Sequence, residues 1–242
     1  MIVNLAQNGW EVIYHRAHAL LAAQLAGQWK RTNAPERLYE TIAAISHHDD
    51  LEKEWEGNEL TEAGAPLDFT LGRSSDIEPL RKHLENAYYR GRWVTLLLSK
   101  HLCFLNQDQR DNSLEWDEFL QEQAKNQEKW RKELGINKNE AERAYQFMLW
   151  CDTLSLILAR KQIPDAGRSL EITSGIDQQR YDLHQLENGC LTVQPWCFEE
   201  EKFTVNIEAS CLKKLKFENS EELVTALKNA PIKTIEWTFM KV

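Results

Sequence analysis

The 242-residue chain has no apolar run long enough to cross a bilayer, and its first residues, Met1 to Asn4, lack the basic-then-apolar order of a signal peptide. Basic residues are also in short supply, because 29 Lys and Arg stand against 38 Asp and Glu, a formal net charge of −9. We therefore expect neither a membrane partner nor a nucleic-acid duplex partner, although a local basic pocket is compatible with this balance.

Cysteine is scarce as well. The five cysteines are odd in number and scattered, and no two of them form a Cys-x-x-Cys motif. Cys103 and Cys151 lie in apolar helical stretches, where a thiol is typically a small buried hydrophobe. This pattern of cysteines predicts a reduced, cytoplasmic protein.

With 42% hydrophobic residues, the chain can bury the core of one large or two small domains.

What the sequence does contain is the run His47-His48-Asp49-Asp50, directly after an apolar helical stretch. His and Asp are common ligands for Zn, Mn, Fe and related ions. Adjacent residues on a helix point about 100° apart, so His48 and Asp49 can face one ion only where a helix ends. Taken alone, the run is more simply a solvated helix end. His18 on an upstream helix and Asp152, the only charge in a long apolar stretch, favour a metal site instead.

His15 lies three residues before His18 on the same predicted helix, so the two side chains share a face. An i, i+3 histidine pair can bind a metal. We nevertheless expect one of the two to be a surface residue.

The two ends of the chain are rich in β-formers, and the middle is helical. Asn8-Gly9 between residues 2–5 and 10–14 predicts a hairpin, which is marginal alone and needs further strands. Candidate partners are the β-like runs 170–173, 181–186, 190–193, 203–209 and 232–240. We predict an α+β fold, with a mainly α-helical bundle over residues 15–163 and a small mixed sheet built by residues 1–14 and 166–242.

Lys100 and His101 interrupt a stretch that is apolar nearly all round, so their helix should be central. Either they act in a site, or Lys100 reaches solvent while His101 is hydrogen-bonded in the core. Residues 51–75 show little periodicity and predict a long loop of the kind that forms lids or binding sites. Asp68, Phe69 and Arg73 are its candidates to face a substrate, against the simpler interpretation of a plain surface loop.

The order His18, then His48-Asp49, then Asp152, each on or at the end of a separate helix, resembles the HD-domain superfamily of metal-dependent phosphohydrolases and their relatives. Most of the chain looks more closely like an uncharacterised bacterial family of HD-like proteins of unknown function. The motifs that carry this likeness are Ala17 to Ala26, His48 to Asp50, Leu98 to His101 and Cys151 to Leu156. After the His-Asp pair that family usually continues Gly-Trp, whereas this chain has Leu51-Glu52.

The resemblance implies an HD-like helical bundle and metal-assisted hydrolysis of a small phosphoester or nucleotide. The implied ligands of one divalent ion (Mn, Fe, Co, Ni or Zn) are His18, His48, Asp49 and Asp152. Asp50 could orient or deprotonate the attacking water, while Lys100, His101 and Arg73 could neutralise developing phosphoryl charge.

Two alternatives stay open at this point. An HD-like fold can keep its pocket without turnover, which makes the chain a ligand- or partner-binding protein. The polar residues can also satisfy one another in the core without a metal. The sequence leaves the oligomeric state open, with a homodimer as one option.

Overall fold

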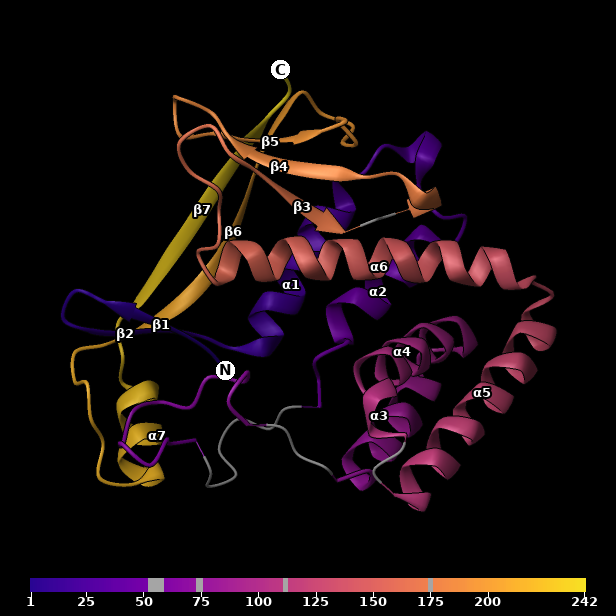
Figure 1. Cartoon of the computed structure of the whole chain (residues 1–242), viewed down its shortest axis with the longest axis horizontal. Coiled ribbons are helices and arrows are strands. Elements are labelled where there is room, and N and C mark those ends of the chain that lie inside the picture. The colour runs from indigo at the N-terminus through magenta and orange to yellow at the C-terminus, as the bar shows by residue number, and fades with distance from the viewer. Residues whose placement is uncertain (52–58, 73–75, 111–112, 174–175) are drawn as a thin grey trace.

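The computed structural model describes residues 1–242 except 52–58, 73–75, 111–112 and 174–175. About 48% of the structure is helical and about 21% lies in strands. Strands from both ends of the chain form one curled seven-stranded sheet, and the helices of the middle of the chain lie to one side of it (Figure 1). Within the described residues, no helix combines the length and the apolar character needed to cross a membrane.

The elements follow the chain in a simple order: a hairpin, a block of helices, then mostly strands. The strands are β1 (Ile2–Ala6), β2 (Gly9–Ile13), β3 (Ser169–Thr173), β4 (Tyr181–Gln185), β5 (Leu191–Gln194), β6 (Lys202–Leu212) and β7 (Ile232–Met240). The α-helices are α1 (His15–Gly27), α2 (Leu38–His47), α3 (Glu78–Tyr88), α4 (Arg92–Leu105), α5 (Leu114–Leu134), α6 (Lys138–Ala159) and α7 (Ser220–Lys228).

The prediction of a mainly helical bundle with a small sheet is wrong. The strand order is β1-β2-β6-β7-β5-β4-β3, a continuous sheet rather than an appendage. Its centre is the antiparallel pair β6–β7, which stays in register from Lys202 opposite Met240 to Ser210 opposite Ile232. The only parallel neighbours among the described strands are β5 and β7. The short runs of β-formers pair side by side in one sheet. The length of each run therefore did not reveal how large the sheet is.

The N-terminal hairpin pairs with a C-terminal strand, as its marginal stability alone predicts. Val12 of β2 lies opposite Ser210 of β6. The turn that ends in Gly9 needs a glycine, because φ there is 147° and a Cβ atom would lie 1.9 Å from the carbonyl oxygen of Leu212. The hairpin is therefore fitted closely against β6.

Helices α1 and α6 form the layer next to the sheet, where α1 contacts β6 and α6 contacts β3. Helices α2 and α4 pack on this pair, and α3 and α5 lie outside them, on the side away from the sheet (Figure 1). Between the layers, Trp29 packs edge-on against Trp150 and Phe198 with ring centroids 4.9 and 6.2 Å apart. These buried aromatic contacts fix α6, and with it Asp152, relative to the sheet.

Local signals set the ends of several helices. Asn137 and Glu140 form the capping box that their spacing predicts at the start of α6. Residues 76–106 predict a helical stretch with a kink near Gly91, and the structure divides this stretch there into α3 and α4, with a φ of 109° at Gly91. Helix α2 stops at His47, so the His-Asp run leaves the helix as a turn.

Candidate metal centre

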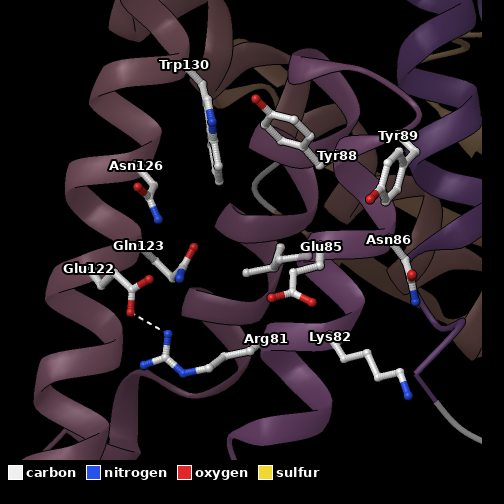
Figure 2. Close-up of a pocket in the computed structure, with 11 residues that line it drawn as sticks. Arg81, Lys82, Glu85, Asn86, Tyr88, Tyr89, Glu122, Gln123, Asn126 and Trp130 are labelled. Atoms are coloured by element: carbon white, nitrogen blue, oxygen red, sulfur yellow. Dashed lines mark hydrogen bonds and ion pairs between the residues drawn. The ribbon is translucent and has the colours of Figure 1, made fainter.

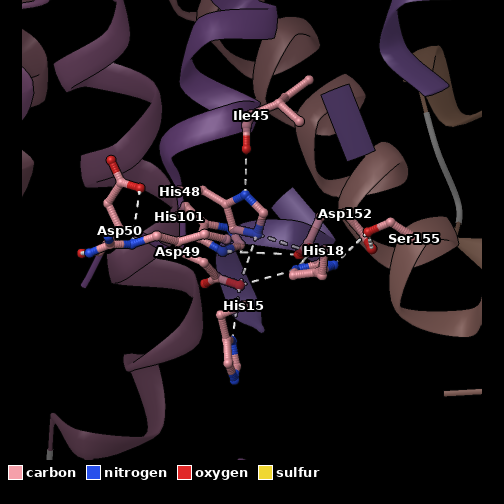
Figure 3. Close-up of polar contacts among 10 residues, drawn as sticks. His15, His18, Ile45, His48, Asp49, Asp50, His101, Asp152 and Ser155 are labelled. Carbon is pink, nitrogen blue, oxygen red and sulfur yellow. Dashed lines mark hydrogen bonds and ion pairs between the residues drawn. The ribbon is translucent and has the colours of Figure 1, made fainter. Parts of the chain in front are cut away.

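Four polar side chains from three helices converge in the interior. His18 belongs to α1, His48 and Asp49 follow the end of α2, and Asp152 belongs to α6 (Figure 3). His48 is the C-cap residue of α2, which places the pair at a helix end, the position from which neighbouring residues can reach one point. His18, His48 and Asp152 are buried, and Asp49 is the most exposed of the four, with 22% of its side chain accessible.

The distances between the ligand atoms match those around a single ion. His18 Nε2 lies 3.0 Å from Asp49 Oδ2 and 3.2 Å from Asp152 Oδ1. His48 Nε2 lies 3.2 Å from Asp152 Oδ1 and 3.5 Å from Asp49 Oδ2. Atoms that bind one ion at about 2.1 Å in tetrahedral or octahedral geometry are separated by about 3.0–3.4 Å. These four His–Asp distances thus have the spacing of ligands that share a cation, and His18, His48 and Asp49 form one group that could hold an ion.

Hydrogen bonds from the far side of each ring fix which nitrogen faces this point. His48 Nδ1 lies 2.6 Å from the carbonyl oxygen of Ile45, which can only accept, so Nδ1 donates. Ser155 Oγ donates to the carbonyl oxygen of Asp152 at 2.8 Å, so it accepts from His18 Nδ1 at 2.7 Å. In both neutral rings Nε2 therefore carries a lone pair aimed at two carboxylates. Such an arrangement needs positive charge at its centre, either a metal ion or a proton on each ring.

The pKa values point the same way. Burial opposes the charged imidazolium, yet the charges of Asp49 and Asp152 raise the pKa of His48 to about 10. Against the same effect of burial, hydrogen bonds to Asp152 and Asp49 raise the pKa of His18. Burial also opposes ionisation of the two carboxyl groups, but His48 and His18 hold the pKa values of both well below the usual range. The cluster therefore binds a cation or keeps protons on its histidines.

One buried atom supports the fit to a metal ion. Asp152 Oδ1 is shielded from solvent, and the Nε2 atoms of His18 and His48 each lie 3.2 Å from it. A buried carboxylate oxygen is costly without positive charge beside it, which either an ion or the protonated rings would supply. Imidazole nitrogen and carboxylate oxygen are ligands suited to Zn, Mn, Fe, Co and Ni alike. The residues present fit a divalent ion, and their chemistry does not choose among these metals.

His15 was missed as a neighbour of the cluster, and the expectation that one of His15 and His18 is a surface residue is wrong. Both are buried, and His15 Nδ1 lies 3.2 Å from Asp49 Oδ2. The i, i+3 spacing on α1 was the available signal, because it places both rings on the face toward α2.

The polar pair on α4 is divided between two environments. His101 is buried, with Nε2 4.0 Å from Asp152 Oδ2 and its ring 5.1 Å from that of His48. Burial lowers the pKa of His101 to about 4. His101, His48 and Asp152 form a second group that could hold an ion. Lys100 instead forms an ion pair with Glu142 at 2.8 Å, so the expected catalytic role of Lys100 stays a prediction.

Asp50 turns away from the buried cluster. Its Oδ2 lies 2.7 Å from His47 Nδ1 and 3.6 Å from a guanidinium nitrogen of Arg90, and its Oδ1 lies 3.7 Å from Arg16 Nε. All three partners contact the carboxylate that the resemblance assigns to orienting or deprotonating the water. Two of them, Arg16 and Arg90, carry permanent positive charge. The role of Asp50 in deprotonating water stays a prediction, and its contacts in the structure are with two arginines and His47.

Two of the three loop candidates are anchored in the protein. Asp68 accepts a hydrogen bond from the backbone of Val3 at 2.9 Å, which ties the loop to β1. Phe69 packs edge-on against His15 with ring centroids 5.1 Å apart. Arg73 lies outside the described residues.

A comparison with protein families finds one matching description, "Protein of unknown function (DUF3891)", over residues 1–214. Searches of curated proteins and of solved structures find no match. The match extends from the hairpin through all the helices that carry the cluster to the end of β6. The site therefore lies within the shared part of the family.

Proposed function

The chain belongs to the DUF3891 family, whose description assigns no function, so we propose from its site that it is a metal-dependent phosphohydrolase of the HD type, acting on a small phosphoester or nucleotide. One observation carries the proposal: two Nε2 lone pairs and two carboxylates converge at 3.0–3.5 Å in a buried place. Their order along the chain, His18, His48-Asp49 and Asp152, is the HD-like order.

His18, His48, Asp49 and Asp152 would hold the ion. The chemistry that a divalent ion would supply there is a lowered pKa for a coordinated water and polarisation of a phosphoryl oxygen. The chain supplies the orientation: Ile45 and Ser155 fix the two rings from behind, which keeps each Nε2 aimed inward.

The partial exposure of Asp49 indicates where a substrate approaches. The other three ligands are buried, so the side of the cluster near Asp49 and Asp50 is the accessible one. His101 is buried beside Asp152. As a neutral imidazole it can accept or donate one hydrogen bond there without adding charge.

The test combines metal content with turnover. Protein purified without chelator is analysed for transition metals, then assayed with added Mn²⁺ on a panel of phosphomonoesters and nucleotides. We expect about one bound ion per chain and hydrolysis of at least one substrate, both lost in Asp152→Asn. Asp165→Asn is the matched control, because Asp165 is an exposed carboxylate in a turn, paired with Arg168.

Each of the other outcomes supports a different function for this chain. A bound ion without turnover of any substrate supports a ligand- or partner-binding module. Absence of any metal, with a normally folded chain, supports a network of side chains that satisfy one another and contradicts the proposal.

A further inference from the structure

A pocket of about 680 Å³ lies beside the candidate metal centre, on the side where Asp50 emerges. Its walls come from the start of α1, the turn after α2, and α3 with the residues that follow it. The charged residues that line it are Arg16, Asp50, Asp76, Glu78, Lys82 and Arg90. The net charge of this lining is balanced, so its selectivity depends on where the charges lie.

The positive charge is concentrated at the end next to the metal centre. Arg90 follows the C-terminal end of α3, and both it and Arg16 contact Asp50, the neighbour of Asp49. Asp76 and Glu78 lie at the other end of α3, where Asp76 accepts a hydrogen bond from the backbone of Glu78. An 11-residue helix is about 16 Å long. The end of the pocket next to the cluster thus carries two arginines against one carboxylate, Asp50, and the other two carboxylates of the lining, Asp76 and Glu78, lie at the far end.

Asp50 holds these arginines without exhausting them. Arg16 uses Nε toward the carboxylate and a terminal nitrogen toward the backbone oxygen of Asp50, at 3.7 and 3.3 Å. Arg90 uses one terminal nitrogen, at 3.6 Å. A guanidinium has five N–H donors in a planar fork suited to phosphate, so each can bind a second anion while it stays on Asp50.

A buried histidine also lines this pocket. His83 on α3 is only 6% exposed, and its Nε2 forms no hydrogen bond among the described residues. Burial lowers the pKa of His83 to about 4, so the ring is neutral near pH 7 and can offer an N–H without bringing charge. A buried nitrogen in the wall of a pocket needs a hydrogen-bond partner, which water or a bound ligand supplies, so His83 Nε2 is available to a ligand that enters the pocket.

We propose that this pocket binds the phosphate group of the substrate, with Arg16 and Arg90 as its charged donors, His83 as a neutral donor, and Asp50 as the residue that positions the two arginines. This assignment rests on the proposed phosphohydrolase function and deepens it. It moves the phosphate-binding role from Lys100, which is paired with Glu142, to residues next to the accessible side of the cluster.

The neighbouring pocket supplies a matched control. Figure 2 shows a pocket of about 450 Å³ between α3 and α5, in which Arg81 pairs with Glu122. Lys82 and Asn86 lie on the opposite side of α3 from Arg81 in this view. Arg81→Gln and Arg90→Gln therefore remove the same charge from the same part of the chain, but only the second removes it from the proposed phosphate site.

The probe is inorganic phosphate, titrated by calorimetry into the purified protein with added Mn²⁺ and, separately, with EDTA. We expect saturable binding in both, and tighter binding with Mn²⁺. Arg16→Gln and Arg90→Gln should each weaken binding about 10-fold, because each removes a charge-assisted hydrogen bond, whereas Arg81→Gln should not change it. His83→Leu should weaken binding, and His83→Gln, which keeps an N–H donor, should restore most of it. A melt of each variant checks that it folds.

The outcomes separate this proposal from the enzymatic one. Equal phosphate affinity in the wild type and all arginine variants, or binding that vanishes completely in EDTA, would overturn the phosphate site and leave a metal-bound phosphate as the explanation. Arginine-dependent binding without turnover of any phosphoester would support the site and contradict the hydrolase. Absence of saturable binding in either condition would overturn the site whatever the enzymatic result.

Discussion

Metal binding should release protons from the cluster. His48, with a pKa raised to about 10, is almost fully protonated near pH 7, and His18 is shifted in the same direction. Both rings use Nδ1 for hydrogen bonds on the far side, so the proton that leaves is the one on Nε2. We expect between one and two protons released per ion near pH 7, and an apparent affinity that rises by one to two powers of ten per pH unit between about pH 6 and 8.

The same shifts set the pH dependence of stability, with opposite signs with and without metal. The contribution of raised His pKa values is fully present below about pH 6.5 and is lost as pH rises through the folded value near 10. The contribution of the lowered Asp pKa values is lost only as pH falls below about 4. The protein in EDTA should therefore become less stable from pH 6 to 9, while saturating metal becomes more stabilising.

Metal at about 100 times its dissociation constant adds about 2.7 kcal/mol. For a chain of this length that corresponds to a rise in melting temperature of roughly 5–10 °C. Calorimetry in two buffers of different ionisation enthalpy counts the protons, and melts with Mn²⁺ or EDTA across pH measure the stability. In Asp152→Asn, which removes a ligand and part of the field that protonates both rings, the affinity and the proton count should fall. Asp165→Asn should match the wild type. Metal binding that releases no protons would refute this account of the cluster, as would a melting temperature indifferent to every divalent ion.

Three further predictions follow from other parts of the fold. Gly9→Ala should destabilise the protein by about 3 kcal/mol or more in denaturant melts, since its Cβ would overlap the Leu212 carbonyl. Gly27→Ala, whose Cβ would meet nothing within 4 Å, should be neutral or stabilising by about 0.5–1 kcal/mol. Equal effects of the two substitutions would contradict the close fit of the hairpin turn against β6. Lys100→Met should leave metal content unchanged, because Lys100 pairs with Glu142, but His101→Gln should reduce metal affinity or activity about 10–100-fold, because His101 lies beside Asp152. Loss of metal in Lys100→Met, with no effect of His101→Gln, would contradict this assignment. A fragment of residues 15–163 should be helical by circular dichroism yet aggregate, since α1 and α6 lose the sheet they cover; a soluble fragment that unfolds cooperatively would contradict this.

Features encoded by neighbouring residues could be predicted from the sequence. Asn8-Gly9 gave the hairpin, and the Asn137–Glu140 spacing gave the start of α6. The helix end at His48-Asp49 followed from the angle between adjacent helical residues, and the structure has the helix ending there. Each of these depends on contacts within a few residues, so no knowledge of distant partners was needed.

Features that depend on distant partners could not be predicted. The strands were found individually, but the size of the sheet depends on β6 and β7 joining the N-terminal hairpin to β5, β4 and β3. His83 was not singled out from the sequence, because its burial depends on the packing of α3 against other elements. The arginines on Asp50 are 34 residues before it and 40 after it, and no local pattern relates them.

The end of α2 explains how two adjacent carboxylates come to have different partners. Within a helix Asp49 and Asp50 would point about 100° apart on one cylinder, and only one could reach the interior. In the turn after His47, Asp49 faces His18 and His48 in the interior, while Asp50 faces His47, Arg16 and Arg90 at the pocket. One carboxylate therefore lies among the candidate metal ligands, and the next holds the cations proposed to bind phosphate. Because the two are joined by a single peptide bond, the proposed phosphate site cannot move far from the metal centre. Asp50→Asn should accordingly weaken phosphate binding by loosening both arginines, with the metal content kept, whereas Asp49→Asn should lower the metal content itself. Loss of metal in Asp50→Asn, measured by elemental analysis, would contradict this separation.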